Sequence, residues 1–210
     1  MEATNGIPGS IVSSMSVVEG APPAAAREQQ AIDALVLRAK GGDAEAFGLL
    51  YDRHRAEIVR YLAHQTADWD TAEDLAQQVF LKAWQAIPRY ELRGVPFKAW
   101  LYRMAKNQMI DHVRRRRPTT DLEGVEIAEP AEAEDAVLAA ELRTQLHAAL
   151  ERLSADHREV LVLRFLMEKS AAEIGQIMGR KEVTVRGLQL RALRALRREV
   201  EQMGQLGVSR

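Results

Sequence analysis

The sequence predicts an all-α protein of two small helical domains joined by a flexible acidic linker. Apolar residues make up 47% of the 210 residues and aromatic residues only 5%, a mixture that suits helices packed on helices better than a β-rich core. Apolar residues recur at helical spacing through two long parts of the chain. Between these parts, residues 119–135 carry Gly124, Pro130 and seven acidic residues but no basic ones, as is typical of an extended or disordered segment.

The first predicted domain, residues 31–118, follows a tail of residues 1–30 that we expect to be flexible because it shows no sustained period. Helical periodicity indicates four helices, of which two lie within 31–64 and are separated at Gly41-Gly42, one covers 70–86 and one covers 97–118. Asp43 is expected to cap the second helix, and Pro88 to end the third. The segment Arg89–Pro96 is expected to form a loop before the fourth helix.

The second predicted domain covers residues 136–206. Its expected elements are a helix over 136–153, a helix capped by Ser154 that runs to about Met167, a short helix over 170–178, a turn at Gly179-Arg180 and a long helix over 181–203. A short helix, a turn with glycine and a longer basic helix is the pattern of a helix-turn-helix.

Positive and negative charges are segregated along the chain, although the formal net charge is only −1. Residues 97–118 contain seven basic residues and one acid, and residues 180–198 again contain seven and one. The acidic linker lies between the two basic blocks, so the charges cancel in the total. Clustered basic residues favour contact with nucleic acid, which the net charge alone would not indicate.

The final helix is predicted to have one apolar face and one arginine-rich face. The apolar face contains Val185, Leu188, Ala192, Ala195 and Leu196. The opposite face contains Arg186, Leu190, Arg191, Arg194, Arg197 and Arg198. Arginine can grip a phosphate or the edge of guanine with two N–H groups, so this face favours DNA contact. The alternative is a solvated amphipathic helix whose arginines only keep it soluble.

The third helix carries two large apolar residues out of phase with its buried stripe. The stripe consists of Ala72, Leu75, Ala76, Val79, Ala83 and Ile87. Leu81 and Trp84 instead lie on the side of Asp74 and Gln77. Apolar residues on a polar face often mark a partner surface, and the alternative is a second contact inside the same domain.

The fourth helix is apolar around most of its circumference but keeps one polar stripe. Arg103, Asn107 and Arg114 align in this stripe beside Trp100 and Asp111. An aromatic ring beside amides and arginines suits single-stranded nucleic acid, whose bases stack and whose phosphates need neutralising. The alternative is internal pairing of Asp111 with Arg114 or Arg115.

Enzyme classes receive little support from the sequence. The chain has no cysteine, which excludes a disulfide framework, a thiol nucleophile and a cysteine-ligated metal site. The five histidines show no metal-binding spacing, and there is no glycine-rich phosphate loop. We therefore expect no enzyme, no cofactor and no metal. A signal peptide and a membrane span are also not expected, which predicts a cytoplasmic protein.

Three segments resemble the extracytoplasmic-function sigma factors of bacterial RNA polymerase, in the order and spacing of that family. Residues 70–84, DTAEDLAQQVFLKAW, resemble the polymerase-binding helix. Residues 96–117, PFKAWLYRMAKNQMIDHVRRRR, are similar to the promoter-melting helix. Residues 153–165, LSADHREVLVLRF, together with AEIG at 172–175 and the final helix, resemble the fourth sigma region. The likeness extends over about residues 32–203.

The resemblance implies a non-catalytic transcription initiation factor that binds core RNA polymerase through its β and β′ subunits and directs it to promoter DNA. An anti-sigma factor is a further candidate partner. The segment that docks on the β′ clamp helices would use Asp74, Leu75, Gln78, Phe80, Leu81 and Trp84. In this family the acidic linker threads through polymerase channels otherwise used by nucleic acid.

The resemblance also implies two promoter contacts. The loop Arg89–Pro96 would help to capture a flipped base of the minus-10 element. The full minus-10 set would be Arg89, Tyr90, Arg93, Trp100, Arg103, Asn107, Arg114, Arg115, Arg116 and Arg117. The minus-35 major groove would be faced by Thr184, Arg186, Gly187, Leu190 and Arg191.

Three positions depart from the family pattern. Gly175 stands where alanine is frequent and is expected to loosen its short helix. Lys181 and Val183 stand where small polar residues and glycine are frequent, which bears on the promoter sequence recognised. Two other classes of protein are the alternatives. A helix-turn-helix regulator would bind duplex DNA without polymerase, and a helical adaptor would tolerate charge reversal at Arg186 and Arg191.

Overall fold

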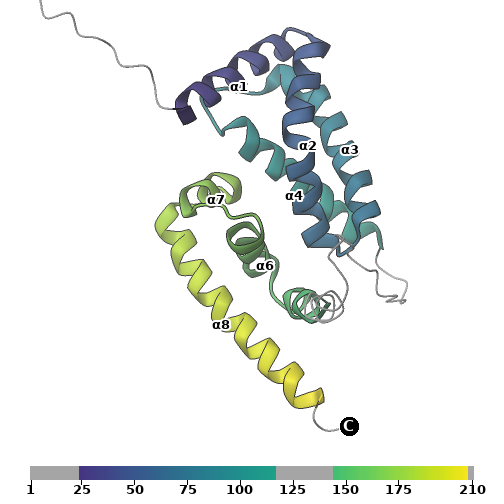
Figure 1. Cartoon of the computed structure of the whole chain (residues 1–210), viewed down its shortest axis with the longest axis vertical. Coiled ribbons are helices and arrows are strands. Elements are labelled where there is room, and N and C mark those ends of the chain that lie inside the picture. The colour runs from purple at the N-terminus through teal and green to yellow at the C-terminus, as the bar shows by residue number, and fades with distance from the viewer. Residues whose placement is uncertain (1–23, 117–143, 208–210) are drawn as a thin grey trace, which may run out of the picture.

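The structure is a computed structural model and describes residues 24–116 and 144–207. These residues form helices and no strand, in two groups (Figure 1), which confirms the all-α prediction. The first group consists of α1 (Ala24–Lys40), α2 (Ala44–Thr66), α3 (Trp69–Ala86), the 3-10 turn η1 (Ile87–Arg89) and α4 (Phe97–Arg116). The second consists of a helical segment at 144–151, α6 (Ala155–Leu161), the π-helical η2 (Val162–Leu166), α7 (Ala171–Met178) and α8 (Glu182–Gly207).

Side-chain caps explain where the helices of the first group begin. The Asp43 carboxylate accepts a hydrogen bond from the backbone N–H of Ala46 at 3.0 Å, so the predicted cap of α2 is confirmed. The Asp68 carboxylate accepts from the backbone N–H groups of Asp70 and Thr71 at 3.2 and 3.3 Å at the start of α3. These amides have no partner within the helix, so each cap stabilises its first turn. Gly42 separates α1 from α2 with a φ of 90°, which glycine adopts readily.

The helix-turn-helix of the second group is fixed by a capping box and a glycine turn. The Ser170 hydroxyl accepts from the backbone N–H of Glu173 at 3.2 Å, and the Glu173 carboxylate accepts from the N–H of Ser170 at 2.9 Å. Gly179 then ends α7 in the left-handed region, with a φ of 67°. The sequence therefore sets both the start of α7 and the turn that leads into α8.

The buried faces agree with the predicted periodicity. Every residue of the predicted α3 stripe is at most 2% exposed, and this stripe packs between α2 and α4. On α8 the predicted apolar face is buried except at Leu196, which is half-buried.

Two predicted boundaries change. Residues 24–30 were expected in the flexible tail but form the start of α1, because this segment is rich in the helix formers alanine, glutamate and glutamine. Glu28 also pairs with Arg53 of α2, which holds this first turn against the domain. The last helix extends to Gly207 rather than Met203. The predictions for residues 1–23, for the linker 119–135 and for residues 136–143 lie outside the described residues.

Candidate nucleic-acid interface

The outer face of α8 presents the side chains predicted to meet the minus-35 element. Thr184, Arg186, Leu190 and Arg191 are exposed, and Gly187 lies partly exposed among them. The Glu182 carboxylate accepts hydrogen bonds from Arg186 Nε at 3.2 Å and Nη2 at 2.6 Å, which orients this guanidinium. Arg191 makes no ion pair with any residue that the structure describes. Its guanidinium is therefore available for a phosphate or a base edge.

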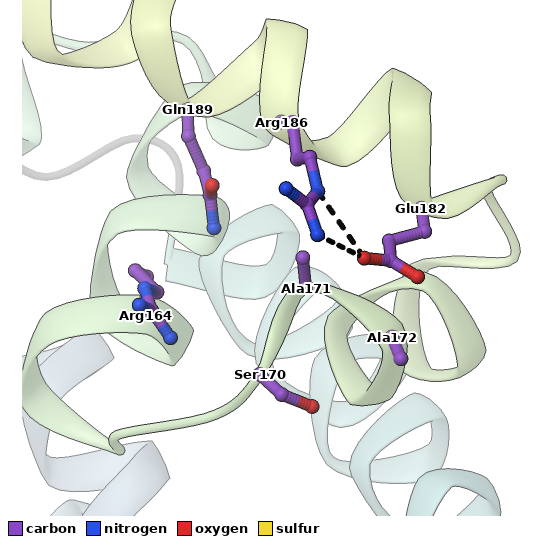
Figure 2. A pocket seen from close by; sticks show the side chains of 7 residues that line it. All are labelled: Arg164, Ser170, Ala171, Ala172, Glu182, Arg186 and Gln189. Carbon is purple, nitrogen blue, oxygen red and sulfur yellow. Dashed lines mark hydrogen bonds and ion pairs between the residues drawn. The ribbon is translucent and has the colours of Figure 1, made fainter.

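A hollow of about 330 Å³ lies beside this face, between η2, the start of α7 and α8 (Figure 2). Arg164, Arg186 and Gln189 point toward it, together with the carboxylate of Glu182. Gln189 Nε2 is buried and has no hydrogen-bond acceptor in the structure. The start of α7 also borders the hollow, but its capping box already engages the backbone N–H groups of Ser170 and Glu173. Arg164, Arg186 and Gln189 are therefore the groups that could donate to an anion such as a DNA phosphate, which would compete with the Glu182 carboxylate for Arg186.

Arg164 and Gln189 were missed by the sequence analysis. They belong to different elements and come together only when η2 packs beside α8, so no helical wheel places them on one surface. Arg164 donates a hydrogen bond to the carbonyl of Lys169 at 3.0 Å, which holds it at the rim of the hollow. The available signal was its place within the 153–165 segment that carries the family resemblance.

Gly175 is required by the geometry of the helix-turn-helix. A Cβ atom at this position would lie 2.7 Å from the carbonyl oxygen of Arg180, closer than side-chain carbons come to backbone. The N–H of Arg180 also donates to the carbonyl of Gly175 at 2.9 Å. The expectation that Gly175 loosens α7 was therefore wrong, because the turn into α8 passes too close for alanine.

The loop that follows η1 is held in shape by Tyr90. The Tyr90 ring is 6% exposed and packs against Phe97 and Trp100, with ring centroids 5.8 and 5.0 Å away. Its hydroxyl donates to the carbonyl of Val95 at 2.6 Å, and its own carbonyl accepts from Lys40 of α1. Burial raises the pKa of the Tyr90 hydroxyl to about 12, so it stays protonated. Tyr90 was predicted to touch DNA, but here its ring is buried and shapes the loop.

The polar stripe of α4 is partly exposed as predicted. Asn107, Arg114 and Arg115 are exposed, and Trp100 is half-buried against the Tyr90 ring. The side chains of Arg116 and Arg117 lie outside the described residues. Within residues 24–116 and 144–207, Asp111 forms no ion pair with Arg114 or Arg115, so the internal pairing considered above is not observed.

Arg103 is an exception to the prediction that the polar stripe of α4 is available to DNA. Its Nε donates to the carbonyl oxygen of Ile177 at 3.1 Å, and its Nη2 donates to that of Gln176 at 2.6 Å. Both acceptors lie in the last turn of α7, whose carbonyls have no partner within the helix. Arg103 therefore binds the second domain in this structure.

The predicted polymerase-binding residues of α3 fall into three sets, which are exposed, half-buried and buried. Asp74, Gln78 and Leu81 are on the surface, and Leu81 is 60% exposed. Trp84 is half-buried, with its ring centroid 5.0 Å from that of Phe47. Leu75 and Phe80 are only 2% and 3% exposed and belong to the hydrophobic core. The prediction that these last two contact a partner does not fit the structure, because the resemblance marks the segment and not the side of the helix.

No cluster of three metal-ligating side chains occurs within residues 24–116 and 144–207. None of the helices in that part of the chain is both long and apolar enough to cross a bilayer.

Comparison with known proteins identifies both helical groups. The family Sigma-70 region 2 matches residues 50–119, and the family Sigma-70, region 4 matches residues 149–198. The chain is 36% identical over 180 residues to the ECF RNA polymerase sigma factor BldN of Streptomyces coelicolor, over 84% of this chain and 68% of that protein. It is 35% identical over 177 residues to the ECF RNA polymerase sigma factor SigL of Mycobacterium tuberculosis, over 81% of this chain and 98% of that protein.

Solved structures agree with these relatives. CnrH, in a structure described as its complex with the cytosolic domain of CnrY, is similar with a TM-score of 0.62 and 26% identity, over 82% of this chain and 98% of that one. RpoE of Bartonella quintana, solved in complex with the anti-sigma factor NepR, shares the fold with a TM-score of 0.56 and 23% identity, over 74% and 96% of the two chains.

Proposed function

The chain belongs to the extracytoplasmic-function sigma factors of bacterial RNA polymerase, and from this premise we propose which surfaces perform its function. As a sigma factor it is a transcription initiation factor, not an enzyme, and it directs core polymerase to promoter DNA. The observation that supports the residue assignments is the exposed arginine face of α8 beside the hollow lined by Arg164, Arg186 and Gln189.

We propose that α8 reads the minus-35 element in the major groove. Arg186 and Arg191 would supply the charged contacts, and Thr184, Gly187 and Leu190 would lie against the base edges. The hollow formed with Arg164 and Gln189 would receive a phosphate of the DNA backbone. Protein–DNA interfaces usually combine both kinds of contact, because phosphate contacts position a helix and base contacts give sequence preference.

We propose that the minus-10 element is held by the loop after η1 and by the stripe of α4. Arg89 and Arg93 are exposed on the loop, and Asn107, Arg114 and Arg115 follow along α4. The half-buried ring of Trp100 offers a stacking face at the junction of loop and helix, as single-stranded bases require. Tyr90 would act by keeping the loop in shape. Arg116 and Arg117 remain predicted phosphate contacts.

We propose that core polymerase docks on the outer side of α3. Leu81 supports this assignment, since a leucine that is 60% exposed among polar neighbours has no partner in its own domain. Asp74, Gln78 and the accessible edge of Trp84 would surround it. The partner of this surface would be the β′ subunit, and the β subunit remains a predicted partner without an assigned surface.

We further propose two promoter-binding domains with a linker at about 119–135, a cytoplasmic location, and control by an anti-sigma factor. The positions of the two Sigma-70 matches support the domain limits. The cytoplasmic location follows from the need to reach polymerase and chromosomal DNA. RpoE of Bartonella quintana was solved in complex with an anti-sigma factor, which supports a similar partner for this chain.

Transcription in vitro tests the proposed function. Purified chain is added to core polymerase with a library of genomic fragments, and start sites are mapped. We expect new start sites that share two upstream elements at fixed spacing. Tight binding of duplex DNA by the chain alone, without any effect on initiation, would instead favour a helix-turn-helix regulator.

A further inference from the structure

The last residue of α1 reaches across to the loop that follows η1. Lys40 is half-buried, and its Nζ donates a hydrogen bond to the backbone carbonyl of Tyr90. A hydrogen bond from an ammonium group is about twice as strong as one between neutral groups. Among the residues that the structure describes, Lys40 makes no ion pair, so the Tyr90 carbonyl is the acceptor for its charged end.

The packing of α1 holds Lys40 in place. The buried face of α1, which is at most 8% exposed, consists of Ile32, Val36 and Ala39. This face seats the helix against α2, α4 and η1 of the same domain. Directly after Lys40, the N–H of Gly41 donates to the carbonyl of Arg38 at 2.9 Å, which fixes the backbone at the end of the helix. The ammonium group is therefore extended toward the loop from a fixed base.

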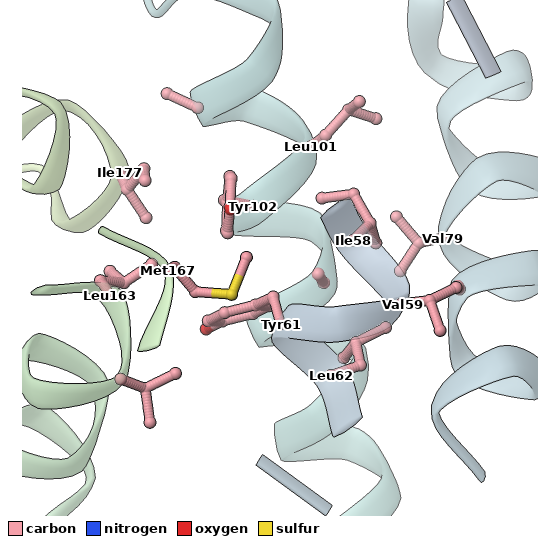
Figure 3. Close-up of a cluster of buried hydrophobic side chains, with 14 of the residues drawn as sticks. Ile58, Val59, Tyr61, Leu62, Val79, Leu101, Tyr102, Leu163, Met167 and Ile177 are labelled. Carbon is pink, nitrogen blue, oxygen red and sulfur yellow. The ribbon is translucent and has the colours of Figure 1, made fainter. Parts of the chain in front are cut away.

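The far end of the loop is anchored by α4. Leu101 of α4 is fully buried, and in Figure 3 it points toward the side of the core where Ile58 of α2 and Val79 of α3 lie. Phe97, the first residue of α4, is only 1% exposed. Burial of large apolar side chains holds a helix firmly in its domain. The conformation of the loop therefore depends on how its first residues are fastened.

Tyr90 connects Lys40 to the rest of the loop. Its carbonyl accepts the Lys40 hydrogen bond, and its N–H donates to the carbonyl of Ile87 at 3.0 Å. Its hydroxyl donates to the carbonyl of Val95 at 2.6 Å, and its ring centroid lies 5.0 Å from that of Trp100. A shift of Tyr90 would therefore move both the arginines of the loop and the stacking face of Trp100.

We propose that Lys40 is a positioning residue for recognition of the minus-10 element, which acts on the loop through Tyr90 without touching DNA. The inference rests on the proposed minus-10 surface. Lys40 precedes the Sigma-70 region 2 match, which begins at residue 50, so α1 influences promoter preference from outside the matched segment. Without Lys40 the Tyr90 carbonyl loses its charged donor, the loop takes up more than one position, and selection of the captured base weakens.

Hydrogen exchange in the free full-length chain tests the anchor. The N–H of Gly94 donates to the carbonyl of Glu91 at 3.1 Å, and together with the N–H of Tyr90 it senses opening of the loop. In Lys40→Met both amides should exchange about tenfold faster than in the wild type, because a charge-assisted hydrogen bond to the loop is lost. Unchanged exchange would overturn the anchoring role of Lys40.

Two matched variants make this result specific. Lys40→Arg keeps a long cationic donor and should retain the wild-type exchange rates. Arg38→Met breaks the 2.8 Å pair with Asp43 at the same end of α1 and should leave the loop amides unchanged. Equal acceleration in Arg38→Met would instead attribute the effect to loosening of α1 as a whole and would overturn the assignment.

Base preference in transcription tests the positioning role. Polymerase reconstituted with each full-length variant is assayed on a mapped promoter and on copies with single-base changes in the minus-10 and minus-35 elements. Lys40→Met should lower the preference at one minus-10 position by about tenfold, since a small misplacement of contacting groups is costly. Preference at the minus-35 positions should stay the same, and Lys40→Arg should restore the minus-10 preference. A loss by the same factor on every template would overturn the positioning role.

Further outcomes separate this inference from the proposed function. Lys40→Gln, whose side chain is one bond shorter, replaces Lys40→Met if circular dichroism shows that Lys40→Met is unfolded. Faster exchange with unchanged minus-10 preference would overturn the inference, while normal initiation by the wild type would leave the function standing. A wild-type chain that initiates from no promoter would reject the proposed function, and the exchange rates would still decide whether Lys40 anchors the loop.

Discussion

Arg191 and Arg186 lie on the same exposed face of α8 but differ in how they are held. Glu182 fixes the Arg186 guanidinium with two hydrogen bonds, whereas Arg191 has no ion pair among the described residues. An arginine fixed by a neighbouring carboxylate is already oriented for one geometry. An arginine without such an ion pair can take its orientation from the DNA, so replacing it removes the DNA contact without breaking an ion pair within the protein.

Replacing Arg191 with alanine should weaken promoter binding by the polymerase holoenzyme by about 1–3 kcal/mol at promoters with the preferred minus-35 base, because a two-pronged contact to a base edge is lost. The measurement is the dissociation constant on a set of promoters that differ at single minus-35 positions. Arg197→Ala, which removes the partner of Glu201 farther along α8, serves as the control and should cost less. An equal loss on every promoter would identify Arg191 as a phosphate contact.

Replacing Leu81 with glutamate should abolish binding to core polymerase and leave the fold intact, because this side chain is on the surface and not in the core. Co-purification with core measures the effect. Leu37→Glu, at a leucine of α1 that is 58% exposed, is the matched control and should bind core normally. Unchanged binding by Leu81→Glu would refute the assigned surface on α3.

His54 should make the free energy of unfolding depend on pH. The side chain is 4% exposed, its Nε2 has no partner, and burial lowers its pKa from 6.5 to about 4. The unfolded chain therefore binds a proton between pH 6.5 and about 4 that the folded chain does not. This contribution to stability is fully present above pH 6.5 and is lost as the pH falls toward 4.

The difference between wild type and His54→Gln isolates this effect. Between pH 7.5 and pH 5 the wild type should lose about 2 kcal/mol more stability than the variant, which cannot take up the proton. Urea denaturation at the two pH values measures the difference. Parallel pH profiles for the two proteins would show that His54 is not buried in its neutral form.

At the level of single elements, α7 and its turn illustrate how a backbone contact can override helix propensity. Gly175→Ala should destabilise the second domain by about 1–3 kcal/mol, because the new Cβ lies 2.7 Å from the carbonyl of Arg180. Gly48→Ala in α2 is the matched control, since no atom lies within 4 Å of a Cβ there. The control should stabilise by about 0.5–1 kcal/mol. Thermal unfolding compares the two, and stabilisation by both would contradict the tight turn.

The helices themselves were largely predictable from the sequence, but the contacts between helices were not. Period, caps and glycine turns are local properties, so the α3 stripe, the Asp43 cap and the α7–α8 turn were confirmed. Burial of Leu75 and Phe80 and the close approach at Gly175 depend on which elements meet. The start of α1 was missed because its first residues carry helix propensity without an apolar period. The hollow lined by Arg164 and Gln189 also could not be predicted. It forms only where η2 and α8 pack side by side, and the sequence does not show which elements meet.

At the scale of the whole molecule, the segregation of charge along the chain was predictable from the sequence, but the contacts of basic residues between the two helical groups were not. Arg103 was expected to face DNA, and the internal contact considered for this helix was a pairing of Asp111 with Arg114 or Arg115. In the structure Lys106 and Arg103 instead hold the second domain, through a buried carboxylate and two backbone carbonyls. Basic residues of one helix therefore make contacts within the chain that the sequence alone did not indicate.

The most direct measurement is transcription in vitro from one mapped promoter. Core polymerase is assayed alone, with the wild-type chain, and with the Leu81→Glu chain. We predict a transcript from that promoter with the wild-type chain and none in the other two samples. No initiation from any template in the presence of the wild-type chain would contradict the account, because the chain would then not direct polymerase to promoters.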